Sequence, residues 1–380
     1  MSEQVTTKNT TTHSLSDQFD RAVELNGKSN KEEKNMILEE TFAPEVNIEE
    51  QFLFRPATMA DLEPAVKLFE ICSKHMIGRP EATLSDVRAE WLLPDFDLET
   101  STRVVLTPEG RLVGYAEVWD IDETPVNIWV WGRVHPDYEG QGIGSTLMDW
   151  ARSRARQALN RVPDDVRVVM RSGTYSTYKP GHQLLKDHGM TPIRHFFTMA
   201  IELAERPPGP TWPAGITVRP MKGPEEARDV VWAVDNAFRD HWGYVEQPFE
   251  KELEHWLHFM KHEEHFDPDL WYLAMDGDEI AGVSLCMPQS REDKDMGWVR
   301  VLGVRRPWRR KGLGLALLHY SFGEFYKSGK ARVGLGVDAS SLTGATRLYE
   351  RAGMHPIRQW DTYELELRPG RDITLQELNE

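Results

Sequence analysis

Apolar and polar residues alternate in two separate stretches of the chain, and each stretch predicts a β-hairpin. Residues 104–118 (VVLTPEGRLVGYAEV) and 272–286 (YLAMDGDEIAGVSLC) each hold two alternating runs joined by a glycine-containing turn. Each hairpin is followed by a glycine-rich turn, at 138–147 and at 308–317, and the second turn leads into an apolar helix. Strands that alternate with helices in this way predict an α/β fold.

The two stretches belong to an internal repeat. Phe54-Arg55-Pro56 corresponds to Val218-Arg219-Pro220, and GMTPIR from Gly189 corresponds to GMHPIR from Gly353. Landmarks in the same order at a nearly constant offset indicate a tandem duplication and therefore two similar domains. With the polar composition of the N-terminus and the prolines near residue 210, the repeat divides the chain into four segments. They are a flexible polar tail (1–50), a first domain (51–204), a proline-rich linker (205–215) and a second domain (216–380).

Composition narrows the class of protein. The 380 residues carry 45 Lys and Arg against 61 Asp and Glu, a formal charge of −16, which argues against nucleic acid because phosphate binding needs a basic surface. Two cysteines, Cys72 and Cys286, exclude a disulfide framework and favour a reducing, cytoplasmic setting. Apolar runs long enough for a membrane span or a signal peptide are absent from the sequence, so we expect neither.

The glycine-rich turn of the second copy has the form of an anion site. Strand-like residues 298–304 lead into Arg309-Arg-Lys-Gly312-Leu-Gly314, and the apolar helix begins directly afterwards. Such a turn points free N–H groups at one spot, where the helix dipole favours phosphate. The chain lacks the G-K-[ST] of a P-loop, and Leu317 breaks the dinucleotide fingerprint. A pyrophosphate turn of another kind is therefore predicted, with an ordinary strand-to-helix loop as the alternative.

The spacing R-x-x-G-x-G at 309–314 resembles the pyrophosphate-binding turn of the GNAT superfamily of acyl-CoA N-acyltransferases. The resemblance covers most of residues 52–368, including a later LYERAGM segment at 348–354, and its landmarks occur twice in a layout similar to that of mycothiol synthases. It implies two tandem GNAT domains, each with a mixed α/β (α+β) sheet whose fourth and fifth strands splay apart around acetyl-CoA.

The same resemblance assigns the residues that bind the cofactor. Strand backbone would hold the pantetheine and thioester, turn amides would bind the pyrophosphate, and Ser341 stands where relatives often carry an asparagine that contacts pantetheine. The assigned residues are Leu302, Gly303, Val304, Arg309, Arg310, Lys311, Gly312, Leu313, Gly314 and Ser341 in the second copy, and Val134, Gln141, Gly142, Ile143 and Gly144 in the first.

The copies differ at two positions that matter for chemistry. Glu139 replaces Arg309, and a carboxylate near pyrophosphate is repulsive unless it turns to solvent. Leu185 replaces Tyr349, which by resemblance donates a proton to the departing thiolate; a phenol keeps its proton at neutral pH. We therefore predict that the second domain is catalytic, and that the first is structural or holds CoA without catalysis. The alternative for Tyr349 is a helix tyrosine packed against the sheet.

The general base is expected on the loop between the first two helices of the second copy, which in GNAT folds borders the acceptor site. Mycothiol synthases carry a glutamate on the fourth strand where this chain has Trp298. The candidates are Asp240, His241 and Glu246, with His241 having the most suitable unperturbed pKa, although each could be a solvated loop residue. Asp338 is a further candidate, which could instead cap a helix.

Two other patterns compete with acyl transfer. His255, His258, His262 and His265 follow one stripe of a predicted helix, and the middle pair could bind a metal ion. The chain lacks H-E-x-x-H, and acyl transfer needs no metal, so we expect none. Cys286 could act as a nucleophile, but a small buried apolar role is expected.

The sequence thus predicts an N-acetyltransferase that moves the acetyl group of acetyl-CoA to a primary amine of a small-molecule acceptor, by direct attack in the second domain. We expect a cytoplasmic monomer or homodimer that binds neither nucleic acid nor membrane. The alternatives are a different acyl donor, a peptide or protein amine as acceptor, or a non-catalytic acyl-CoA-binding regulator.

Overall fold

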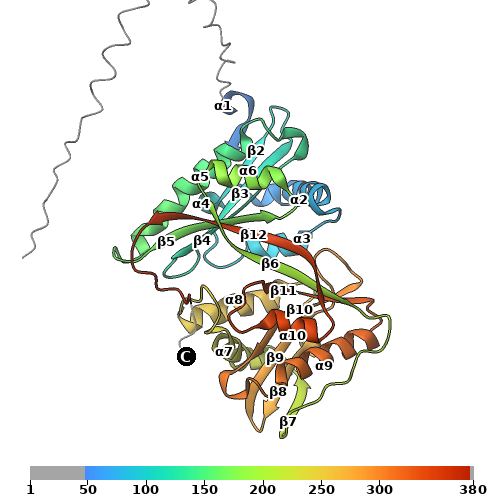
Figure 1. The fold of residues 1–380 in the computed structure, drawn as a ribbon. Helices are drawn as coiled ribbons and strands as arrows, with labels where there is room; N and C mark the ends of the chain where they lie inside the picture. The colour runs from blue at the N-terminus through green and yellow to red at the C-terminus, as the bar shows by residue number, and fades with distance from the viewer. Residues whose placement is uncertain (1–47, 377–380) are drawn as a thin grey trace, which may run out of the picture. The chain divides into compact units, whose positions relative to one another are not determined.

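One mixed sheet of 12 strands runs through residues 48–376, the part of the chain that the computed structural model describes (Figure 1). Residues 1–47 of the predicted tail, and residues 377–380, lie outside the described residues. The strands are β1 (Leu53–Arg55), β2 (Thr102–Leu106), β3 (Leu112–Trp119), β4 (Asn127–Val134), β5 (Val168–Tyr175), β6 (Thr191–Glu202), β7 (Ile216–Pro220), β8 (Trp271–Asp276), β9 (Glu279–Met287), β10 (Met296–Val304), β11 (Arg332–Asp338) and β12 (His355–Arg368).

Helices alternate with these strands. They are α1 (Ile48–Gln51), α2 (Leu62–Ile77), α3 (Leu84–Trp91), α4 (Leu98–Ser101), α5 (Ile143–Gln157), α6 (Lys179–Asp187), α7 (Ala227–Phe238), α8 (Phe249–His262), α9 (Leu313–Lys327) and α10 (Ala345–Arg351). The predicted hairpins are confirmed as β2–β3 and β8–β9, and the helix after the second glycine turn as α9. The proline-rich segment falls within 203–215, which contain neither helix nor strand.

Helices cover both faces of the sheet, because successive side chains of a strand point to opposite faces. In the first half (residues 51–204), Tyr115 packs with α2 and α3, whereas its neighbour Ala116 packs with α5. In the second half (residues 216–380), Leu273 packs with α7 and α8, whereas Ala274 packs with α9. The repeat in the sequence is therefore a repeat of layers as well.

The last strand of each half completes the sheet of the other half. The strand order is β1-β2-β3-β4-β5-β12-β6-β11-β10-β9-β8-β7, so β12 pairs with β5, and β6 pairs with β11 (Figure 1). Tyr363 of β12 is buried in the core of the first half, and Met199 of β6 in that of the second. The duplication does not predict this exchange, because β6 and β12 are similar strands and either could complete the sheet of either half. The domain boundaries at 204 and 216 stay predictions.

Candidate functional site

In each half, two parallel strands pair only where they begin and then separate. β4 and β5 pair over Asn127–Trp129 and Val169–Arg171, whereas β10 and β11 pair over Met296–Trp298 and Arg332–Gly334. The strands diverge beyond these positions, and a cavity lies at each divergence. The splay expected from the resemblance is thus present in both halves.

The cavity at the divergence of β4 and β5, here called the first cleft, has a volume of about 510 Å³. Its lining runs from strand residues such as Val130 and Thr174 to the glycine turn with Gly142 and Gly144. Leu185 of α6 also lines it. The first half therefore keeps an open groove that connects the splayed strands to the turn.

The cavity at the divergence of β10 and β11, here called the second cleft, has a volume of about 280 Å³. Leu302 lines it from β10, Tyr349 from α10 and His241 from the loop after α7. A register shift between Val299 and Val301 leaves Arg300 without a partner on β9. The resulting bulge, which β4 lacks in its pairing with β3, frees backbone polar groups beside this cleft.

The two glycine turns share one backbone conformation. Gly142 and Gly312 both precede a helix with φ of 86°, a left-handed value that glycine adopts without strain. Ile143 and Leu313, the first helical residues, are buried, so only their backbone N–H groups are available to a ligand. Each turn thus presents unpaired amides at a positive helix end, which suits a pyrophosphate.

Arg309 supports the second turn from within the protein. Its Nε donates to the Val304 carbonyl at 2.9 Å, and its Nη2 donates to the Ala237 carbonyl at 2.9 Å. Its Nη1 pairs with Asp240, which also accepts from Arg306. The guanidinium therefore connects the turn to the ends of β10 and α7 through three of its five N–H donors.

The same contacts define the chemistry of Asp240. Hydrogen bonds from Arg306, and then from Arg309, lower the pKa of its carboxyl group. Because a carboxylate held by two guanidinium groups accepts a proton poorly at neutral pH, Asp240 is a weaker base candidate than its neighbour.

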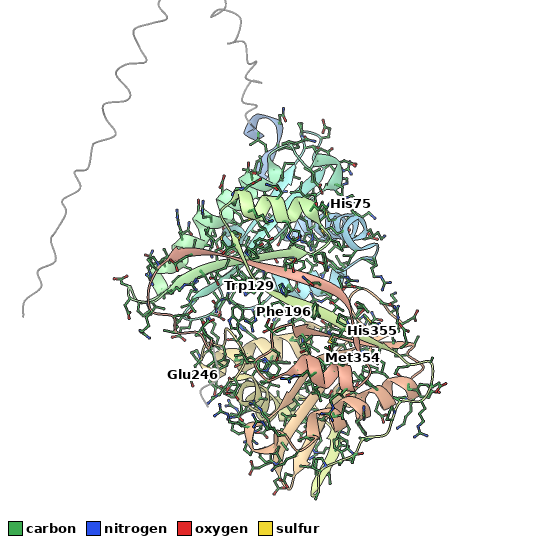
Figure 2. The ribbon with its side chains drawn as sticks, in the orientation of Figure 1. His75, Trp129, Phe196, Glu246, Met354 and His355 are labelled. Carbon is green, nitrogen blue, oxygen red and sulfur yellow. The ribbon has the colours of Figure 1, made fainter. Side chains whose placement is uncertain are left out.

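His241 lies in the second cleft, and its pKa is lowered, first by burial and then by Arg309. The imidazole is therefore neutral near pH 7 and able to accept a proton. Glu246 is exposed and outside the lining of this cleft (Figure 2). Asp338 accepts a hydrogen bond from Arg194 Nε at 2.7 Å, and Ser341 lines the second cleft.

Tyr349 reaches the second cleft from α10 and is 7% exposed. Burial raises the pKa of its phenol to about 12. The hydroxyl has no hydrogen-bond partner among residues 48–376. It therefore keeps its proton at neutral pH and is available to a ligand in the cleft.

The first turn differs in charge. Glu139 accepts a hydrogen bond from the Tyr178 hydroxyl, and both residues line the first cleft. Gln141 is exposed, with Nε2 at 3.3 Å from the Asp137 carbonyl. A carboxylate in this groove opposes an anionic ligand, so we expect weaker pyrophosphate binding here than at the second turn.

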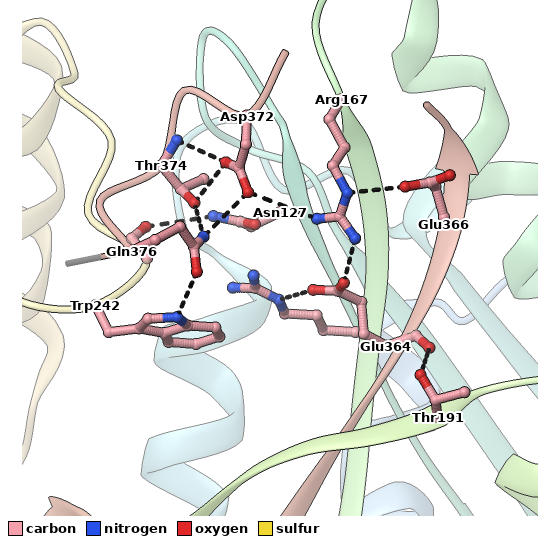
Figure 3. A network of polar contacts seen from close by, with 11 residues as sticks. Asn127, Arg167, Thr191, Trp242, Glu364, Glu366, Asp372, Thr374 and Gln376 are labelled. Atoms are coloured by element: carbon pink, nitrogen blue, oxygen red, sulfur yellow. Dashed lines mark hydrogen bonds and ion pairs between the residues drawn. The ribbon is translucent and has the colours of Figure 1, made fainter. Parts of the chain in front are cut away.

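A C-terminal segment holds the loop that borders the second cleft (Figure 3). Trp242 donates through Nε1 to Gln376 at 2.9 Å, and the Gly243 amide donates to the Leu375 carbonyl at 2.7 Å. The guanidinium groups of Arg171 and Arg194 each lie over the Trp242 ring, 4.4 Å from its centroid. The loop with His241 is thus fixed by contacts to both halves.

Sequence reasoning missed a set of polar residues beside the first cleft. Arg133 donates through Nε to Glu81 at 3.1 Å, and the Tyr175 hydroxyl donates to Glu81 at 2.7 Å. Glu117 is buried on β3, where it accepts from Tyr115. Single charged residues within apolar strands, such as Glu117 and Arg133, could have indicated this set. The sequence does not show, however, which face of the sheet they occupy.

The competing patterns take structural positions. Cys286 is buried and burial raises the pKa of its thiol to about 11. His258 contacts the Ala89 carbonyl at 2.9 Å and lies beside His262. Among residues 48–376, no group of three or more His, Cys, Asp or Glu side chains is arranged to hold a metal ion. Likewise, no helix in the described part of the chain has the length and apolarity to cross a membrane.

Splayed strands, a glycine turn at a helix N-terminus and a duplicated layout define the class of protein. The sequence model of the Acetyltransferase (GNAT) family matches residues 62–166 and 231–354, and the chain belongs to this family. It is an acyl-CoA-dependent acetyltransferase with two tandem GNAT units, as the sequence predicted.

Individual relatives agree with this assignment. Mycothiol acetyltransferases from Streptomyces scabiei and Nocardiopsis dassonvillei are 31% and 29% identical, each over 70% of this chain and over 78% and 80% of their own length. A GCN5-related N-acetyltransferase from Sphaerobacter thermophilus is 34% identical with a TM-score of 0.67, covering 84% of this chain and 97% of that one. A tandem GNAT protein from the clavulanic acid biosynthesis pathway, 16% identical, shares the fold with a TM-score of 0.62 over 84% of this chain and 100% of that one.

Proposed function

We propose that this protein transfers the acetyl group of acetyl-CoA to a primary amine of a small-molecule acceptor, in the second cleft. The observation that carries the proposal is the buried Tyr349 phenol, which lies beside the splayed strands with its hydroxyl unengaged among residues 48–376. The first cleft has Leu185 in the corresponding place, and leucine has no proton to give.

Acetyl-CoA would lie across β10 with its pyrophosphate at the second glycine turn. Backbone groups of Leu302, Gly303 and Val304 would hold the pantetheine and thioester, and the amides from Arg310 to Gly314 would bind the pyrophosphate, with the side chains of Arg310 and Lys311 adding positive charge. Arg309 would fix the turn, because its side chain is bonded to Val304, Ala237 and Asp240.

The reaction would proceed by direct attack. His241, neutral because burial lowers its pKa, takes a proton from the acceptor ammonium, and the free amine attacks the thioester carbonyl. Backbone N–H groups at the β10 bulge stabilise the oxyanion. The C–N bond forms and the C–S bond breaks as the oxyanion collapses, and Tyr349 donates its proton to the departing thiolate. The attacking nitrogen then gives its second proton to the Tyr349 phenolate, which becomes a neutral phenol again.

The acceptor is a small molecule in this proposal, because the second cleft measures about 280 Å³. Since relatives are named mycothiol acetyltransferases, compounds of the mycothiol type are the first acceptors to test. A screen of amines with detection of the released thiol extends that test. We also propose a cytoplasmic enzyme, a monomer or homodimer, without nucleic acid partners.

Tyr349→Phe tests the assignment of the second cleft. We expect the turnover of acetyl-CoA and acceptor to fall by about 100-fold, because general acid catalysis supplies at least that factor, with little change in acetyl-CoA affinity. Tyr326→Phe, at an exposed tyrosine of α9, is the control. Unchanged turnover in Tyr349→Phe would remove this residue from the mechanism.

A further inference from the structure

A third cavity, of about 490 Å³, lies between the first and second halves. We call it the inter-half cavity. Trp131 lines both this cavity and the first cleft, and Arg300 lines both this cavity and the second cleft. A molecule in the inter-half cavity is thus next to the splayed strands of both halves, and Glu117, which lines this cavity, belongs to the first.

The inter-half cavity is acidic. Arg291 and Arg300 are outnumbered in its lining by carboxylates, which are Glu81, Asp86, Glu90, Glu117, Glu263 and Glu292. Arg291 pairs with Glu90 at 2.9 Å, Arg133 pairs with Glu81, and Arg358 pairs with Glu292. Glu117 and Glu263 are in no such pair among residues 48–376, and the guanidinium of Arg300 lies 4.2 Å from the Phe259 ring centroid. The carboxylates without an arginine partner leave net negative charge in this cavity, which attracts a cation.

Glu117 is placed differently from the other carboxylates. It is 8% exposed and makes no ion pair with any residue of the described chain. Its oxygens accept from the Tyr115 hydroxyl at 2.7 Å and from Trp119 Nε1 at 2.8 Å. On β4, the residue directly opposite is Trp131. The carboxyl group therefore stands where the inter-half cavity meets the first cleft.

Burial is the main cause that raises the pKa of Glu117, to about 7. Glu90 on α3 raises this pKa further, whereas hydrogen bonds from Tyr115 and Trp119 and the charge of Arg133 on β4 lower it. Asp86 on α3 and Arg291 of the second half also face this cavity. A carboxyl group that titrates near neutral pH is suited to take a proton and release it in each turnover.

We propose that the first half carries a second acyl-transfer site, in which the first cleft holds acyl-CoA, the inter-half cavity binds a cationic primary amine and Glu117 accepts the proton of that amine. This inference goes beyond the proposed function, which needs only the second cleft, and it departs from the expectation that the first domain is inert. This inference and the proposed function share only the use of acetyl-CoA.

The step balances without a further reactant. The acceptor ammonium gives one proton to the Glu117 carboxylate, and the neutral amine attacks the acetyl carbonyl carbon. The C–N bond forms, the C–S bond breaks, and the departing thiolate takes the second proton of the attacking nitrogen. Glu117 then returns its proton to water, and the products are the amide and CoA.

Tyr115 is a positioning residue in this scheme. It lines the first cleft, donates to Glu117 and accepts from Trp91 Nε1 at 3.1 Å. Because its hydrogen bond lowers the pKa of Glu117, Tyr115→Phe should move the pH at which the base becomes active upward. A role confined to packing would leave that pH unchanged.

The experiment measures thiol release from acetyl-CoA by the full chain carrying Tyr349→Phe. The amines are 1,4-diaminobutane and, as the analogue with a neutral tail, 4-amino-1-butanol. We expect turnover of the diamine to persist, to exceed that of the amino alcohol at least tenfold in kcat/KM, and to rise with pH through about 7. Adding Glu117→Gln should lower it at least tenfold, whereas the control Glu63→Gln, at an exposed carboxylate of α2, should not.

Several outcomes would overturn the second site. They are diamine turnover that vanishes in Tyr349→Phe, turnover that survives Glu117→Gln, an acid limb that Tyr115→Phe does not shift, and a wild-type chain that acetylates neither amine. Tyr115→Phe keeps the ring, so it decides the question even if Glu117→Gln unfolds. A different result would contradict the proposed function, namely that Tyr349→Phe acetylates the acceptor of the second cleft at an unchanged rate.

Discussion

Two neighbouring residues of one loop differ as candidate bases because their contacts differ. Asp240 and His241 were both candidates for the base in the sequence, with His241 having the more suitable unperturbed pKa. Two guanidinium groups now hold Asp240 in its ionised form, whereas burial and a nearby guanidinium keep His241 uncharged. The pKa of both groups is thus lowered, but only the imidazole starts from an ordinary pKa near neutrality, which is the condition for an effective base.

The pH dependence of the second cleft follows from His241. A base acts when deprotonated, and the pKa of His241 is lowered from 6.5, so activity should rise with pH through a limb below that value. His241→Asn should lower turnover at least tenfold and remove the limb, since general base catalysis contributes about 10²–10⁴-fold. Rate profiles between pH 5 and 8 check this.

The control for that profile is His319→Asn, which changes a half-buried histidine of α9. A limb that persists in His241→Asn at an unchanged pH would assign it to another group.

At the scale of elements, the exchange of β6 and β12 joins the two halves energetically. Each strand pairs on both sides, so that β12 lies between β5 and β6, and β6 lies between β12 and β11. Tyr363 of β12 is 3% exposed in the core of the first half, and its hydroxyl contacts His182 Nδ1 at 2.8 Å. The C-terminal strand is therefore part of the stability of the N-terminal half.

Tyr363→Ala should show this dependence. Removing a buried aromatic side chain costs about 3–5 kcal/mol, and we expect the loss of amide hydrogen-exchange protection to appear first in β5, far away in sequence. Tyr363→Phe keeps the ring and should cost only about 1 kcal/mol, for the lost hydrogen bond. Exchange that increases in β11 while β5 stays protected would contradict the shared-strand account.

For the whole molecule, the formal charge of −16 opposes an anionic cosubstrate. Binding then depends on local features, and the two turns differ in them: Arg310 and Lys311 add positive charge to the second, whereas Glu139 adds negative charge to the first. The first cleft is nevertheless the larger, at about 510 Å³ against 280 Å³. From this contrast we expect two acetyl-CoA sites of unequal affinity.

Calorimetric titration of the full chain with acetyl-CoA should therefore resolve two binding events. Gly142→Val and Gly312→Val form a matched pair, because both glycines have φ of 86° and a side chain there costs about 1–2 kcal/mol of backbone strain. Each variant should remove one event, with Gly312→Val removing the tighter. A single event that is insensitive to Gly142→Val would show that the first cleft does not bind acetyl-CoA.

Much of the fold could be predicted from the sequence because its signals are local. The alternation in residues 104–118 and 272–286 gave the hairpins, and Gly142 and Gly312 marked the helix starts. Side-chain contacts between residues far apart in the chain could not be predicted. The assignment of Arg309 to the pyrophosphate turn stays a prediction, whereas the hydrogen bonds of its side chain to Val304, Ala237 and Asp240 could not be predicted from the motif.

The sequence by itself determined that the chain is a duplicated α/β protein with two glycine turns and that only the second copy has Tyr349, because periodicity, turn residues and motif spacing are written along the chain. The tertiary structure decided which half each last strand completes and how large each cleft is. It also decided which carboxylates meet in the inter-half cavity. These depend on strand pairing and burial between residues far apart in the chain, which no local pattern encodes.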